Sequence, residues 1–141
     1  MCWRPSGSRL VRSCYDDFLP AEIDFNQHLG IRVVRHHKDG VTISCDLRKE
    51  LHNMSGVLHG GVTATLVDVA AGMALMHRGQ KATTVELKIN YLRPVTGRKV
   101  TARSRFVRIG KTLVTAVVDV FDDHKNRAAI GIVTYMLLGA Q

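Results

Sequence analysis

The residues best suited to chemistry in this 141-residue chain lie in one short segment, residues 53–61, which reads NMSGVLHGG. His59 is followed there by two glycines, Gly60 and Gly61, at the expected start of a helix. The first backbone N–H groups of a helix have no intrahelical partner and carry about +0.5 charge. A carbonyl oxygen directed at them would be stabilised as it becomes an oxyanion. Two glycines can also serve only close packing, so this pattern alone leaves both interpretations open.

Asp68 is the sharper signal, because it interrupts an otherwise apolar helical stretch. A buried carboxylate is costly unless it is hydrogen-bonded or has a chemical function. A nearby hydroxyl such as that of Thr65 could satisfy it structurally. As a functional group, it could act as a general base on water or as a nucleophile.

Gly60 and Asp68 are eight residues apart, which corresponds to about 12 Å along a helix axis. The Asp68 side chain cannot span that distance to a carbonyl held at its own helix start. If both groups serve one reaction centre, they must come from two subunits whose helices run in opposite directions. The sequence therefore predicts a homodimer.

The hydrophobic pattern predicts one main helix, from about Gly60 to His77, with apolar residues on nearly every side, as in a buried helix. A short helix, 24–29, and two strands, 31–37 and 41–47 joined at Asp39-Gly40, precede it. Four strands follow, at 83–92, 99–108, 113–122 and 128–138. The first of these places Val85, Leu87, Ile89 and Tyr91 on one face and Thr84, Glu86, Lys88 and Asn90 on the other. We expect an α+β fold, with a mostly antiparallel sheet of about six strands wrapped around the helix.

Composition indicates an ordinary globular protein, with 45% hydrophobic and 23% charged residues. Three cysteines without CxxC spacing argue against disulfides or zinc and favour a reducing compartment. The longest apolar stretch, 62–76, contains an acid and is shorter than the ~20 residues of a membrane span.

We expect a disordered leader or expression remnant at 1–14 and a single domain at 15–141. The predicted location is the cytoplasm, although the basic leader leaves organelle targeting open.

The formal net charge is +8, and the segment 88–118 contains eight basic residues and no acidic one. Such a field attracts nucleic acid, an anionic membrane or a phosphorylated ligand. The segment has only two aromatic residues, which is few for stacking on single strands. A solvated face of the sheet would give the same pattern.

The pattern Asn-x-x-Gly-x-x-His-Gly-Gly, with an acid nine residues after the histidine, resembles the hotdog-fold acyl-CoA thioesterases. The resemblance is to the branch of the phenylacetate-pathway and 4-hydroxybenzoyl-CoA thioesterases and covers about residues 30–138. It implies a hotdog fold and hydrolysis of an acyl- or aryl-CoA thioester to free acid and CoA. It also implies an active site across a homodimer interface, commonly in pairs of dimers, with coenzyme A present only as part of the substrate and no metal.

The resemblance assigns roles by position. Gly60 would donate its N–H to the thioester carbonyl, and Asp68 of the partner chain would activate water or attack directly. Asn53 would hold the carbonyl or the water, His59 would support the turn, and Thr84 would position the water or the acid. The remaining predicted contacts are Gly61, Arg93, Arg108, Gly110, Lys111 and Thr112 for coenzyme A, with Arg93 on a turn adjacent to 108–112, and Leu66, Val69, Met73 and Val85 for the acyl pocket.

Three other functions fit parts of the sequence. A non-catalytic acyl-CoA binder on the same fold would lack the helix acid, whereas Asp68 is present. A hotdog enoyl-CoA hydratase would also use a histidine and an acid, but the spacing here is more similar to that of the hydrolases. A basic nucleic-acid module would have to show steeply salt-dependent binding. We therefore expect an acyl-CoA partner and neither nucleic acid nor a membrane.

Overall fold

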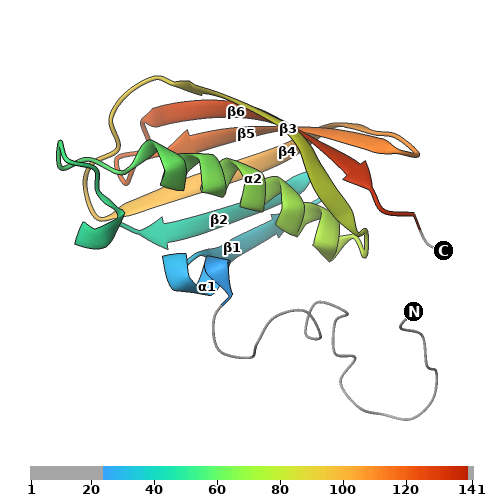
Figure 1. The fold of residues 1–141 in the computed structure, drawn as a ribbon, viewed down its shortest axis with the longest axis horizontal. Helices are drawn as coiled ribbons and strands as arrows, with labels where there is room; N and C mark the ends of the chain where they lie inside the picture. Colours follow the sequence, from blue (N-terminus) through green and yellow to red (C-terminus); the bar gives the residue numbers. More distant parts are fainter. Residues whose placement is uncertain (1–23, 140–141) are drawn as a thin grey trace, which may run out of the picture.

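Six antiparallel strands form one sheet that curls around a long helix (Figure 1). The computed structural model describes residues 24–139, and the predicted leader at 1–14 lies outside that range. The elements are α1 (Phe25–Leu29), β1 (Arg32–His37), β2 (Gly40–Asp46), a 3-10 turn (Lys49–Leu51), α2 (Gly60–His77), β3 (Ala82–Tyr91), β4 (Lys99–Ile109), β5 (Leu113–Phe121) and β6 (Arg127–Leu137). Each predicted element is confirmed within about two residues of its expected ends.

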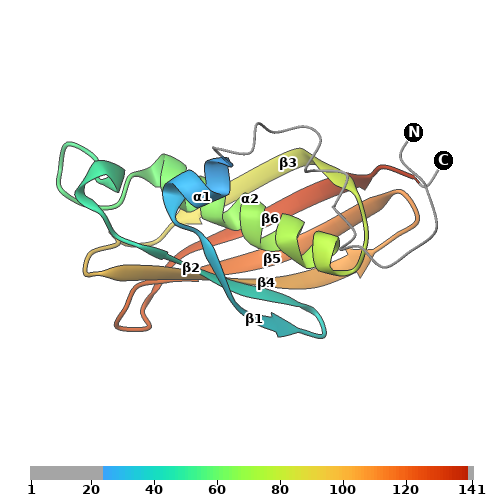
Figure 2. The same cartoon turned by 90° about the horizontal axis from the view of Figure 1, so that it is seen from below.

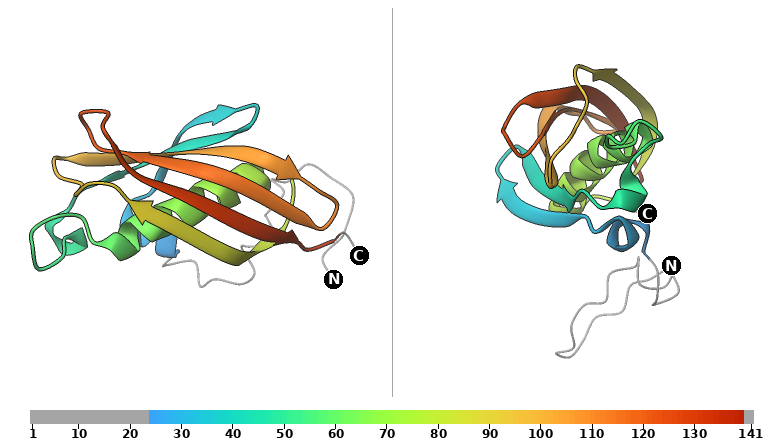
Figure 3. Two further views of the ribbon diagram at one scale, coloured as in Figure 1. Left: turned by 90° about the horizontal axis from the view of Figure 1, so that it is seen from above. Right: turned by 90° about the vertical axis from the view of Figure 1, so that its left-hand side faces the viewer.

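The strand order is β1-β2-β4-β5-β6-β3, and every neighbouring pair is antiparallel. Seen end-on, the sheet curves around α2 (Figure 3). From below, α1 and α2 both lie in front of the sheet (Figure 2). This arrangement confirms the α+β prediction, and it leaves β1 and β3 as the two edge strands.

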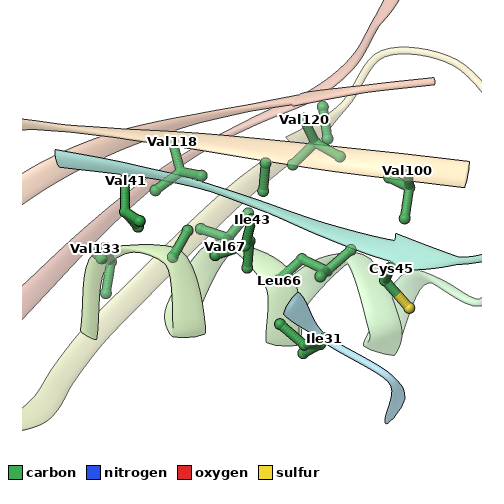
Figure 4. Packing of buried hydrophobic residues seen from close by; sticks show 14 of the residues in the cluster. Ile31, Val41, Ile43, Cys45, Leu66, Val67, Val100, Val118, Val120 and Val133 are labelled. Carbon is green, nitrogen blue, oxygen red and sulfur yellow. The ribbon is translucent and has the colours of Figure 1, made fainter. Parts of the chain in front are cut away.

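The core lies between the concave face of the sheet and one side of α2. Leu66 and Val67 point from the helix toward the strands and have no exposed surface (Figure 4). A side chain at Gly131 in β6 would collide with Val67, so glycine there allows the strand to approach the helix closely. Buried Ser104 links the layers, because its hydroxyl donates to the carbonyl of Ala70 over 2.9 Å.

The prediction that α2 is buried on all sides is wrong for a single chain. The buried helix residues form one stripe against the sheet: Thr63, Leu66, Val67, Ala70, Ala71, Ala74 and Leu75. The sheet curls far enough to cover only this stripe. Val69, Met73 and Met76, on the other side of the helix, keep part of their surface. The apolar residues on this second side therefore have a role other than filling the core.

The predicted faces of β3 are partly wrong because of a β-bulge. The register with β6 shifts between Thr84 and Glu86, so the alternation of faces changes at that point. Thr84 consequently points toward α2, on the same face as Tyr91, although a strict alternation places them on opposite faces. Val85, predicted to line the acyl pocket, is 57% exposed.

The first hairpin also differs in detail from the prediction. His37 pairs with Gly40, so Lys38 and Asp39 form the turn and Gly40 already belongs to β2. The short helix α1 has the expected ends, with Asp24 as the N-cap and Gly30 in the left-handed conformation after it.

The helix α2 passes a length and composition test for a membrane span, with a mean hydropathy of 1.2. The core helix of a globular domain passes the same test, and α2 packs against the sheet of its own chain. The length and hydropathy of α2 are therefore weak evidence for a membrane span.

Candidate active site

The start of α2 presents one free backbone donor. His59 is the N-cap residue, and its Nδ1 accepts the N–H of Gly61 over 2.9 Å. The carbonyl of His59 accepts the N–H groups of Val62 and Thr63. Within residues 24–139, the N–H of Gly60 has no acceptor. Gly60 is therefore the available donor, whereas the N–H of Gly61 is engaged by the cap.

Two side chains fix the geometry of this helix entry. Asn53 forms a turn, in which its Oδ1 accepts from the N–H groups of Ser55 at 2.9 Å and Val57 at 3.3 Å. This leaves the side-chain amide of Asn53 as the group able to donate to a ligand. Tyr91 of β3 donates its hydroxyl to the carbonyl of Gly60 over 2.7 Å. The alternating pattern of β3 shows that Tyr91 faces inward, but the sequence gives no sign of this contact.

The carboxylate of Asp68 is held by two hydroxyls from neighbouring strands. Its Oδ1 accepts from Thr84 Oγ1 of β3 at 2.8 Å and from the Tyr135 hydroxyl of β6 at 2.8 Å. The suggested partner Thr65 instead donates to the carbonyl of Gly61 over 2.9 Å, so Thr65 is the wrong hydroxyl, although hydroxyls from β3 and β6 do satisfy Asp68. Tyr135 was not predicted, because no local pattern marks it.

A cavity of about 330 Å³ opens beside this carboxylate. Its lining residues are Phe25, Asn26, Thr65, Asp68, Val69, Gly72, Met73, Leu75, Met76, Gln80, Ala82, Thr84 and Tyr135. Two of the predicted acyl-pocket residues, Val69 and Met73, belong to this set. The other two do not, because Leu66 is buried in the core against the sheet and Val85 is turned out by the bulge. The second side of α2 is thus the wall of a cavity that contains the acid.

The two chemical groups remain apart within one chain. The helix α2 is continuous from Gly60 to His77, so Gly60 and Asp68 are separated by about 12 Å along its axis. One chain therefore carries a carbonyl-polarising donor and a hydrogen-bonded acid as two separate half-sites.

The predicted coenzyme A contacts also divide into two groups. The N–H of Arg93 donates to the carbonyl of Ala128 at the start of β6, whereas the carbonyl of Thr112 accepts from Leu137 at its end. Nine residues of strand separate these positions, or about 30 Å. Arg93 is therefore not adjacent to Arg108, Gly110, Lys111 and Thr112 in the same chain, and that part of the prediction is wrong.

Part of the basic segment is neutralised within the chain. Arg103 contacts Asp39 at 2.7 Å and Arg105 contacts the buried Asp119 at 2.8 Å. These ion pairs weaken the case for a continuous nucleic-acid-binding face. Within residues 24–139, no group of three or more His, Cys, Asp or Glu residues is arranged to hold a metal ion.

Comparison with known proteins identifies the class of protein to which this chain belongs. The family model of the thioesterase superfamily matches residues 55–129, which include the helix entry, Asp68 and Thr84. The chain belongs to this superfamily, and its sheet and helix form the hotdog fold. It is a thioester hydrolase.

Individual relatives agree with that assignment. The chain is 28% identical over 131 residues to the medium/long-chain acyl-CoA thioesterase YigI of Escherichia coli, covering 80% of this chain and 84% of YigI. It is 41% identical over 80 residues to mouse acyl-coenzyme A thioesterase 13, covering 53% of this chain and 57% of the mouse protein. The crystal structure of the thioesterase HI1161 of Haemophilus influenzae superposes with a TM-score of 0.74 at 25% identity, covering 81% and 82% of the two chains.

The cap of α2 gives a test of what His59 does. Replacing His59 with alanine removes the acceptor for the Gly61 N–H and should lower the free energy of unfolding by about 1 kcal/mol, measured by urea denaturation. Asparagine is a good N-cap residue, so His59→Asn should have wild-type stability and keep its hydrolytic activity. A His59→Asn variant that is as stable as the wild type but inactive would contradict a purely capping role.

Proposed function

We propose that this protein hydrolyses an acyl- or aryl-CoA thioester to the free acid and CoA, at sites formed between two copies of the chain. The observation that carries the proposal is the pair of half-sites. Gly60 offers a free N–H at a helix start, and Asp68 lies in a partly apolar cavity with one carboxylate oxygen fixed by two hydroxyls. The names of the acyl-CoA thioesterase relatives support coenzyme A as the leaving group.

The edge strand β3 is the surface that supports a homodimer. It is ten residues long and lies at the end of the sheet, where its outer backbone groups have no neighbouring strand within residues 24–139. Val85 and Tyr91, at 57% and 56% exposed, leave apolar surface along it. A long exposed edge of this kind readily pairs with another strand. Antiparallel pairing of two β3 strands would set the two α2 helices side by side in opposite directions.

Such a pairing would bring Gly60 of one subunit toward Asp68 of the other. The thioester carbonyl would accept the Gly60 N–H, with the Asn53 amide close by. Asp68 would take a proton from water as the water oxygen attacks the carbonyl carbon. The resulting oxyanion would be stabilised by the amide and the helix dipole. Collapse would break the C–S bond, and the leaving thiolate would receive the proton from Asp68.

The same antiparallel dimer would bring the two separated groups of predicted coenzyme A contacts close together. With antiparallel helices, the turn at 110–112 of one subunit lies toward the Gly60 end of its partner. Arg93 of one chain and Arg108 and Lys111 of the other would then approach one coenzyme A from two sides. Cations at both positions suit its 3′-phosphate and diphosphate.

The acyl group would extend past Val69 and Met73 into the cavity. In this proposal the enzyme works in the cytoplasm, as a dimer or a pair of dimers, without a cofactor of its own.

The direct test is release of free thiol from a panel of acyl- and aryl-CoA esters by the wild type and Asp68→Asn. We expect the variant, which keeps the hydrogen-bonding shape but cannot accept a proton, to lose about two or more orders of magnitude in kcat. The panel also ranks the acyl groups that the cavity accepts. Binding of acyl-CoA without turnover by the wild type would contradict the proposal and favour a non-catalytic binder.

The helix entry allows its N–H to be deleted with little other change. Proline is favoured at the first position of a helix, and His59 before it has φ −62° and ψ 132°, which a following proline requires. Gly60→Pro should therefore preserve α2 while lowering kcat about 100-fold or more, because one oxyanion donor is lost.

Gly60→Ala is the matched control. Its methyl group would lie 3.4 Å from the Tyr91 ring, and it keeps the N–H. We expect Gly60→Ala to retain most of the activity. Equal losses in the two variants, each shown to be folded by circular dichroism, would contradict the role of the Gly60 amide.

A further inference from the structure

The hydroxyl of Tyr135 is buried directly against the acid. Tyr135 is 5% exposed, and its hydroxyl lies 2.8 Å from Asp68 Oδ1 and also contacts the backbone carbonyl of Asp68. Thr84 donates to the same carboxylate oxygen. Both hydroxyls thus act on Oδ1. Within residues 24–139, Oδ2 has no hydrogen-bond partner.

Three separate features of the fold build this contact. Thr84 and Tyr135 are directly paired across β3 and β6, so the two hydroxyls come from neighbouring strands at one level. The bulge that follows Thr84 turns it toward the helix. Gly72, one turn after Asp68 on α2, leaves room for the ring, because a methyl group there would lie 3.0 Å from the Tyr135 hydroxyl. The helix, the strand pairing and the bulge together place both hydroxyls at Asp68 Oδ1.

The surroundings of the Tyr135 hydroxyl keep it protonated, so that it remains a hydrogen-bond donor. Burial, together with the neighbouring Asp68 carboxylate, raises the pKa of Tyr135 well above its usual value. The tyrosine therefore stays protonated throughout the range in which hydrolysis would be measured. Tyr135 is the titratable side chain in contact with the carboxylate, and Thr84 is its uncharged companion.

We propose that Tyr135 is a positioning residue for hydrolysis, which holds Asp68 Oδ1 together with Thr84 so that Oδ2 faces the attacking water. This inference rests on the proposed function. It goes beyond it by assigning the orientation of the acid to a hydroxyl from β6. A carboxylate held by two donors on one oxygen has a single orientation, whereas loss of one donor leaves it free to rotate away from the water.

The first measurement is steady-state kinetics of Tyr135→Phe, which removes one oxygen and keeps the buried ring. We expect kcat to fall about tenfold or more while KM changes by less than about threefold, because the acid is misoriented and substrate contacts remain. Gly72→Ala, which would displace the hydroxyl, should lower kcat in the same way.

A double-mutant cycle separates positioning from general damage to the fold. In an Asp68→Asn background, adding Tyr135→Phe should leave the residual activity unchanged, because the group being oriented is already gone. Equal losses in the wild-type and Asp68→Asn backgrounds would overturn the proposal, as would a Tyr135→Phe enzyme with wild-type kcat. If the wild type turns over and Asp68→Asn is about 100-fold slower, such results would overturn the role of Tyr135 alone. A wild type that hydrolyses no thioester would instead refute the proposed function.

Discussion

A carboxylate placed halfway along the core helix is the constraint on which the rest of this structure depends. Asp68 could not be buried beneath the sheet without losing either its charge or its access to substrate. The helix therefore packs against the sheet with one stripe only, and its other side lines the cavity around Asp68. The all-round apolar character of α2 reflects these two surfaces, one buried in the core and one lining the cavity.

The same helix separates the two halves of the chemistry. Its free N–H is at Gly60 and its acid is about two turns further on, so a straight helix keeps them apart. In the proposed dimer, a second copy with an antiparallel helix would resolve this separation, and the exposed edge of β3 would be the surface for it. The basic residues are also separated within one chain, since Arg93 and the turn at 110–112 lie at opposite ends of β6. In the proposed enzyme, pairing of subunits completes both the catalytic centre and the phosphate contacts.

Local patterns were sufficient to predict most of the fold and the two chemical groups. Alternation and turn residues located the strands, and the short motif with Asp68 pointed to Gly60 and the acid. The surroundings of the acid depended on longer-range structure. A register shift of one residue reversed the face of Thr84, and Tyr135 reaches Asp68 from 67 residues away through a cross-strand pair. No periodicity encodes a bulge, and a tyrosine in an apolar strand looks like any core residue.

Subunit complementation tests directly whether Gly60 and Asp68 meet across a dimer interface. Asp68→Asn and Gly60→Pro chains carrying different affinity tags would be co-expressed, and the mixed dimer would be isolated through both tags and assayed for thiol release. In the mixed dimer, one site combines the intact Gly60 of one chain with the intact Asp68 of the other. We expect the mixed dimer to have about half of the wild-type activity, although each parent variant is nearly inactive. A mixed dimer as inactive as its parents would show that the two groups do not meet across an interface.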